Sequence, residues 1–137
     1  MATKPTSGGD ISGIVSHNHT VNIKHPATGA LIGLAIELRS GTSKEVAAVQ
    51  RQQQNAAIKL AKRGKSFDAD QNEQNGLDVL IAATVSFTWS KNAKGEDATF
   101  EGAQPAFARD VALRLYKSLQ FVAVQAAEAL ADDANFF

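Results

Sequence analysis

Residues 21–38 read VNIKHPATGALIGLAIEL, and this stretch decides the fold class of the 137-residue chain. Apolar side chains alternate with other residues along much of 21–24 and 31–38, which is the period of a β-strand. Between these arms, Pro26 suits the second position of a turn and Gly29 can adopt a positive φ. The segment therefore predicts an antiparallel β-hairpin.

Outward from the hairpin, the sequence predicts a further strand and a helix. Residues 11–15 offer a third short strand, although Gly13 weakens that pattern. Thr42 stands three residues before Glu45, an arrangement in which two side chains satisfy the free amides at a helix start. The helix that begins there is expected to end before Gly64.

Two more helices are expected in the second half. The first should run over about 70–89, with apolar and threonine side chains at three- and four-residue spacing. A loop around Gly95 follows, and Pro105 fits the first turn of the last helix. The expected fold is α+β: an N-terminal antiparallel hairpin or small sheet followed by three helices. We expect a flexible terminus at 1–10 and a single domain over 11–137.

Composition excludes several classes of function. Lys and Arg together number 14, as do Asp and Glu, so no overall positive field draws in a phosphate backbone. The absence of cysteine removes disulfides and thiolate chemistry. The apolar run at 79–89 is too short to cross a bilayer, and residues 1–9 do not resemble a secretory signal. We expect an intracellular protein that binds neither nucleic acid nor membrane.

The sequence offers little equipment for catalysis. His17 and His19 form a His-X-His pair near His25, but no cysteine is present to complete a zinc site, and the nearest acids are Asp10 and Glu37. The carboxylate pairs all lie at predicted element ends: Asp68 and Asp70, Glu96 and Asp97, Asp132 and Asp133. Charges at such ends are explained by helix termini. We expect no enzyme, metal or cofactor; a small hydrolase or metal-binding protein that uses the histidines is the alternative.

The aromatic residues indicate protein contacts. Four of them are expected to form a structural cluster around the loop after the second helix: Phe87, Trp89, Phe100 and Phe107. Tyr116 and Phe121 are expected on the exposed side of the last helix, whose apolar surface is wider than one packing stripe requires. Phe136 and Phe137 must dock on their own domain or on another chain. We assign these last four residues to partner binding or self-association.

The order of these elements resembles a known family, the tail assembly chaperones of long, flexible-tailed bacteriophages (siphophages). The resemblance covers the chain from about residue 21 onward. It rests on six features: the turn at 25–29, the strand at 31–38, the helix opening at Ser43, the run at 78–85, Trp89 before a Gly95-bearing loop with Phe100 ahead of a helix, and the closing Asn135-Phe136. Residues 101–105 depart from it, because such chains often begin the last helix with Ser or Thr.

The resemblance implies a role in virion morphogenesis. Such late proteins bind and solubilise the tape measure protein and recruit tail tube subunits in the host cytoplasm. They generally self-associate and are absent from the mature virion. The family is often made in two lengths by ribosomal frameshifting, and codons for Phe136-Phe137 could form a slippery run of uridines. The alternative within virus assembly is a minor structural virion protein that acts in tail completion or head-tail joining.

Overall fold

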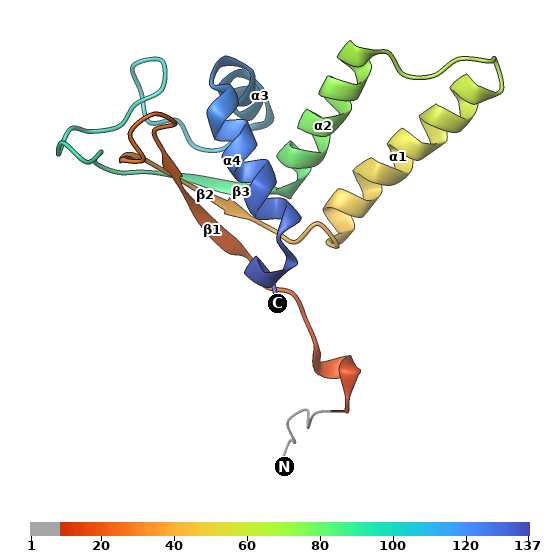
Figure 1. Cartoon of the computed structure of the whole chain (residues 1–137), viewed down its shortest axis with the longest axis horizontal. Coiled ribbons are helices and arrows are strands. Elements are labelled where there is room, and N and C mark those ends of the chain that lie inside the picture. The colour runs from red at the N-terminus through yellow and green to blue at the C-terminus, as the bar shows by residue number, and fades with distance from the viewer. Residues whose placement is uncertain (1–8) are drawn as a thin grey trace.

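The computed structural model describes residues 9–137, so most of the terminus predicted to be flexible, 1–10, lies outside the described residues. In chain order, the elements are the 3₁₀ turn η1 (Ile11–Gly13), β1 (His19–Lys24), β2 (Leu31–Leu38), α1 (Lys44–Ala61), α2 (Ala69–Ala83), β3 (Thr84–Trp89), α3 (Arg109–Ser118), α4 (Gln120–Ala131) and the 3₁₀ turn η2 (Asp133–Asn135). Figure 1 shows a small sheet with helices packed beside it and α1 at the outside. The fold is α+β, as predicted.

The predicted hairpin is confirmed as β1 and β2, which pair in antiparallel fashion with Val21 opposite Ile36. The turn between them is closed by a hydrogen bond of 2.8 Å from the His25 N–H to the carbonyl of Ala30. Gly29 adopts a φ of 73°, the left-handed conformation expected of this glycine. Residues 11–15 do not form the third strand, because Ile11–Gly13 closes into a 3₁₀ turn instead.

The third strand is β3, in a segment where the sequence predicted a helix to continue. Residues 84–89 pair with β2, placing Phe87 opposite Ile36 and Trp89 opposite Leu34. The strand follows α2 without an intervening residue. This segment alternates β-branched or small polar residues with bulky ones, which suits a strand, but the spacing at the end of α2 also fits a helix. Pairing with β2, a long-range interaction, decides between the two.

The first two helices begin at side-chain caps. The Ser43 hydroxyl, and not Thr42 as predicted, accepts the amide of Val46, so the start moves by one residue. Asp68 caps α2 in a reciprocal arrangement: its carboxylate accepts the Gln71 amide at 2.8 Å, and the Gln71 side chain accepts the Asp68 amide at 2.9 Å. The helix-terminal role predicted for Asp68 is confirmed.

The predicted last helix is two helices, so the described part of the chain has four helices where three were expected. The chain breaks at Leu119, whose φ of −121° and ψ of 81° are not helical. A straight helix over 109–131 would be about 35 Å long, and the break lets α3 and α4 pack on each other and on one core. Pro105 lies ahead of α3, which begins only at Arg109.

The core lies between one face of the sheet and the helices. α4 contacts β1 and β2 and crosses the sheet, while α2 packs on α4, α3 and α1 (Figure 1). The most deeply buried large side chains are Ile23, Ile36, Leu38, Val46, Leu115, Tyr116, Val122 and Phe136. On the opposite face of the sheet, Thr20, Asn22 and Thr88 are exposed. The fold therefore has two layers.

Candidate partner-binding site

A groove lies between α2 and α4. Its volume is about 590 Å³. Its lining comprises Glu73, Gly76, Leu77, Leu80, Tyr116, Lys117, Gln120, Ala123, Val124 and Ala127. The lining is mostly apolar, and Val124 keeps 50% of its surface exposed to solvent. The groove thus offers apolar surface that residues 9–137 leave uncovered.

Small residues keep the groove open. Ala123 and Ala127 lie on the α4 side, and Gly76 lies on the α2 side. Glycine in a helix interior destabilises the helix by about 0.5–1 kcal/mol relative to alanine. A Cβ atom at Gly76 would meet no atom within 4 Å, so packing does not require the glycine. Gly76 thus makes α2 less stable than alanine would, and it leaves the groove deeper by the space of one methyl group.

Tyr116 lies beneath the groove, and the prediction that it is exposed on the last helix was wrong. Only 1% of its surface is exposed. Its hydroxyl lies 2.7 Å from the Thr84 hydroxyl, which donates to the Leu80 carbonyl at 2.8 Å. Burial raises the pKa of Tyr116 to about 12, and the hydrogen bond with Thr84 opposes part of that increase. The tyrosine was expected to contact a partner, but it joins α3 to the α2–β3 junction.

The two terminal phenylalanines have different surroundings. Phe136 is 1% exposed and packs edge-on against the ring of His19 at 5.9 Å, so it docks on its own domain rather than on a surface. Its carbonyl accepts the amide of His17 at 2.8 Å. Phe137 is 51% exposed. Phe121 is half-buried against the core and is not part of the groove lining. Of the four residues assigned to partner contact, Phe137 is the most accessible.

The expected aromatic cluster comes together around β3. Phe87 is buried, and the ring of Phe107 packs edge-on against it at 5.4 Å. Trp89 and Phe100 are partly buried against the same core. The Trp89 indole donates a hydrogen bond of 2.7 Å to the carbonyl of Pro105. These rings hold the segment between β3 and α3 on the domain.

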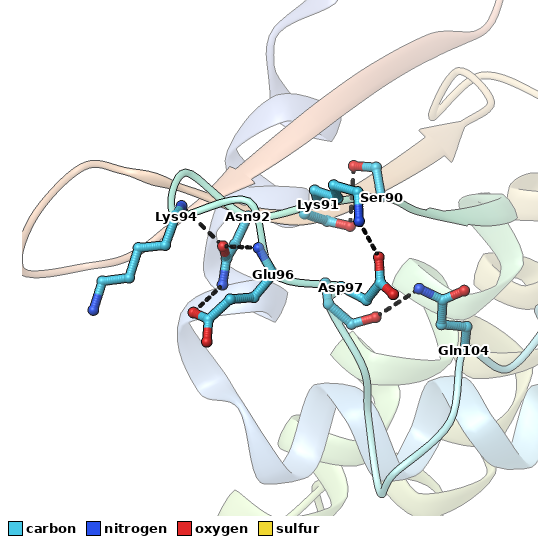
Figure 2. Close-up of polar contacts among 9 residues, drawn as sticks. Ser90, Lys91, Asn92, Lys94, Glu96, Asp97 and Gln104 are labelled. Carbon is cyan, nitrogen blue, oxygen red and sulfur yellow. Dashed lines mark hydrogen bonds and ion pairs between the residues drawn. The ribbon is translucent and has the colours of Figure 1, made fainter.

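The loop around Gly95 is ordered by its own polar side chains. Figure 2 shows the Asn92 carboxamide oxygen accepting the amides of Lys94 and Glu96, at 2.9 and 3.0 Å. The Lys91 ammonium lies 2.9 Å from the Asp97 carboxylate. The Gln104 side chain donates to the carbonyl of Ala98. The acidic pair Glu96 and Asp97 thus takes part in the local hydrogen bonds and ion pair that order this loop.

The histidines do not assemble into a metal site. Within residues 9–137, no three His, Cys, Asp or Glu side chains come together as a ligand set. The His25 ring accepts the amides of Ala27 and Thr28 in the hairpin turn. In the same residue range, no helix has both the length and the apolar character to cross a bilayer.

Sequence reasoning missed most of the groove. The available signal was Val124, which lies off the main packing stripe of its helix and made the apolar surface too wide. Gly76 was a second signal, because glycine is unfavourable in a helix interior. Comparisons of this chain with protein-family models, with curated proteins and with solved structures found no match.

Proposed function

We propose that this chain is a bacteriophage tail assembly chaperone that binds helical segments of the tape measure protein in the groove between α2 and α4. The observation that carries the proposal is the groove, an open apolar trough between two helices. An amphipathic helix that lays its apolar face into such a trough is a recurring mode of recognition. The resemblance of the sequence to this family supports the identity of the partner.

The composition of the groove suits a reversible contact. Its apolar lining includes Leu77, Leu80 and Val124, which bind through buried area and not through a particular charge pattern. Glu73 and Lys117 carry opposite charges at the lining, and the chain has no net charge to steer association. A site of this kind accepts many apolar helix faces along a long partner and releases them when a better-fitting surface arrives.

In this proposal, copies of the chain keep the tape measure protein soluble in the host cytoplasm. They recruit tail tube subunits, which replace the chaperone as they polymerise. The chaperone is then absent from the mature virion. The apolar groove between α2 and α4 supports such a cycle, because it can be covered by a partner and exposed again. The proposal requires no catalytic group, metal or cofactor.

The test is co-expression of this chain with a tape measure protein, followed by measurement of soluble tape measure and its co-purification. Ala127→Arg places a long cation in the groove. The matched control Ala131→Arg makes the same change one turn further along α4, outside the groove lining, and both alanines are exposed. We expect the first variant to lose co-purification and the control to keep it.

Equal retention by both variants would refute the groove as the binding site. Failure of the unaltered chain to keep the tape measure protein soluble would refute the function itself. Detection of the chain in purified virions would favour the alternative of a minor virion protein, since the proposal requires its absence there.

A further inference from the structure

The segment before β1 carries apolar side chains that the domain does not cover. In this N-terminal arm, residues 9–18, Ile11, Ile14 and Val15 are 78%, 64% and 74% exposed. Figure 1 shows the arm leaving the domain beside the C-terminus and pointing away from the helices. Burial of one such branched side chain stabilises a complex by about 1.5–3 kcal/mol. The arm therefore has apolar surface that the described part of its own copy leaves mostly exposed.

The arm also has a preformed turn. The Asp10 carboxylate accepts the amide of Ser12 at 3.0 Å and its hydroxyl at 2.6 Å, and the amide of Ile14 bonds to the carbonyl of Ile11. The three apolar residues have the spacing i, i+3 and i+4. The 3₁₀ turn ends at Gly13, and Ile14 is extended, with a φ of −81° and a ψ of 110°. The arm thus presents Ile11 on the turn and Ile14 and Val15 directly after it, all three exposed.

The base of the arm is fixed at one end of the domain. The His17 amide bonds to the carbonyl of Phe136, and the His19 ring packs on the Phe136 ring. The start of α2 and the junction of α3 with α4 lie at the other end of the domain from the C-terminus (Figure 1). Two of the residues that line the groove at this end are Glu73 and Lys117.

We propose that the N-terminal arm of one copy occupies the α2–α4 groove of a second copy. Both surfaces are apolar and exposed among residues 9–137. The groove lining carries Lys117, whose charge is opposite to that of Asp10 in the arm, as well as the acidic Glu73. Because the arm and the groove are different surfaces, the contact is head-to-tail and leaves one arm and one groove free for further copies.

The arm and the proposed partner helix compete for one groove. In the absence of a partner, the arm of a neighbouring copy shields the groove from water, and a tape measure helix displaces it. This competition rests on the proposed function, whereas the contact between arm and groove does not. The arm–groove contact is therefore tested with this chain alone.

The first experiment is sedimentation equilibrium of the full chain over a wide concentration range. We expect concentration-dependent association, and Ile14→Asp should lower the association constant at least about tenfold because a carboxylate would enter an apolar groove. Ser16→Asp introduces the same charge two residues away and should leave association unchanged. Ile14 lies outside the core, so neither change threatens the fold.

The second experiment mixes two variants that are each defective in one surface. Ile14→Asp retains its groove, and Ala127→Arg retains its arm. At a concentration where the unaltered chain associates, each variant alone should be largely monomeric, and an equimolar mixture should form a 1:1 dimer and nothing larger. A monomeric mixture, or a full chain that stays monomeric at every concentration, would overturn the proposal. Dimerisation of the mixture together with no tape measure binding would refute only the proposed function.

Discussion

The carboxamide of Gln125 forms two hydrogen bonds with the backbone of Lys24, at the end of the edge strand β1. Its oxygen accepts the Lys24 amide at 2.8 Å, and its nitrogen donates to the Lys24 carbonyl at 2.7 Å. A side chain of α4 thus takes the place of a neighbouring strand at this position. Such pairing covers part of an edge that would otherwise remain open to other chains.

Gln125→Leu should accelerate hydrogen exchange at the Lys24 amide and lower the free energy of unfolding by about 1 kcal/mol, since both bonds are lost. Gln125→Glu keeps the acceptor and loses the donor, so it should retain most of the protection of that amide. Exchange measured by NMR checks both. Equal exchange rates in all three proteins would contradict the assignment.

Tyr116 should make the protein less stable at high pH. Its ordinary pKa is 10.0, and burial raises the folded value to about 12, so the unfolded chain loses this proton first. The contribution of protonated Tyr116 to the free energy of unfolding is fully present below pH 10 and is lost as the pH rises toward 12. It amounts to about 2–3 kcal/mol. Tyr116 is the only tyrosine, so absorbance of the phenolate follows it directly. Tyr116→Phe should remove this pH dependence, and a titration midpoint near 10 in the folded chain would contradict it.

Gly33 should be intolerant of a side chain. Its φ is +90°, and a Cβ there would lie 2.7 Å from both the Ala98 Cβ and the Ser90 carbonyl oxygen. Gly33→Ala should therefore lower the free energy of unfolding by about 2–5 kcal/mol. Gly29→Ala is the control: its φ is +73° with open space around it, so only about 1–2 kcal/mol of backbone strain is expected. Denaturant unfolding compares the two, and equal losses would show that the close approach at Gly33 has no cost.

The terminal phenylalanines should differ in their effects on stability. Phe136→Ala removes a fully buried ring and should cost about 3–5 kcal/mol, whereas Phe137→Ala truncates a half-exposed ring and should cost less than about 1 kcal/mol. Thermal unfolding of both variants checks the difference. Similar melting temperatures would contradict the docking of Phe136 on its own domain.

Gly76→Ala should separate stability from binding. Alanine fits at this position without a clash and should raise the free energy of unfolding by about 0.4–1 kcal/mol. The added methyl group narrows the groove, so association with the arm or a partner helix should weaken. Unfolding and sedimentation measured on the same preparation test both. A variant that gains stability and binds as before would show that the glycine does not serve the groove.

Short-range sequence patterns correctly predicted the hairpin and the start of α2, which depend on residues close together in the chain. The alternation of apolar residues and a turn with Pro26 and Gly29 predicted the hairpin, and Asp68 predicted the start of a helix. The strand β3 was missed because its apolar spacing also fits a helix, and only pairing with β2 selects the strand. The break at Leu119 was missed because neither proline nor glycine marks it; packing of α3 and α4 on one core produces it.

The candidate site was less predictable than the fold. Tyr116 and Phe136 are large side chains near the C-terminus, and nothing in their spacing reveals that Thr84 and His19 lie against them. The groove depends on the distance between α2 and α4. That distance is set by how the helices pack in the folded domain, and it cannot be read from the sequence of either helix. Val124 and Gly76 were visible as exceptions to helix patterns, but their meaning depends on which helices become neighbours.

The direct passage from α2 into β3 limits how far the α2 wall of the groove can move. With no linker at Ala83–Thr84, and with the Thr84 hydroxyl tied to both Leu80 and Tyr116, this wall of the groove cannot swing without bending the sheet. The position of this wall is therefore fixed by the sheet. If the groove binds a helix as proposed, segments with small residues along one side will fit beside this wall most readily.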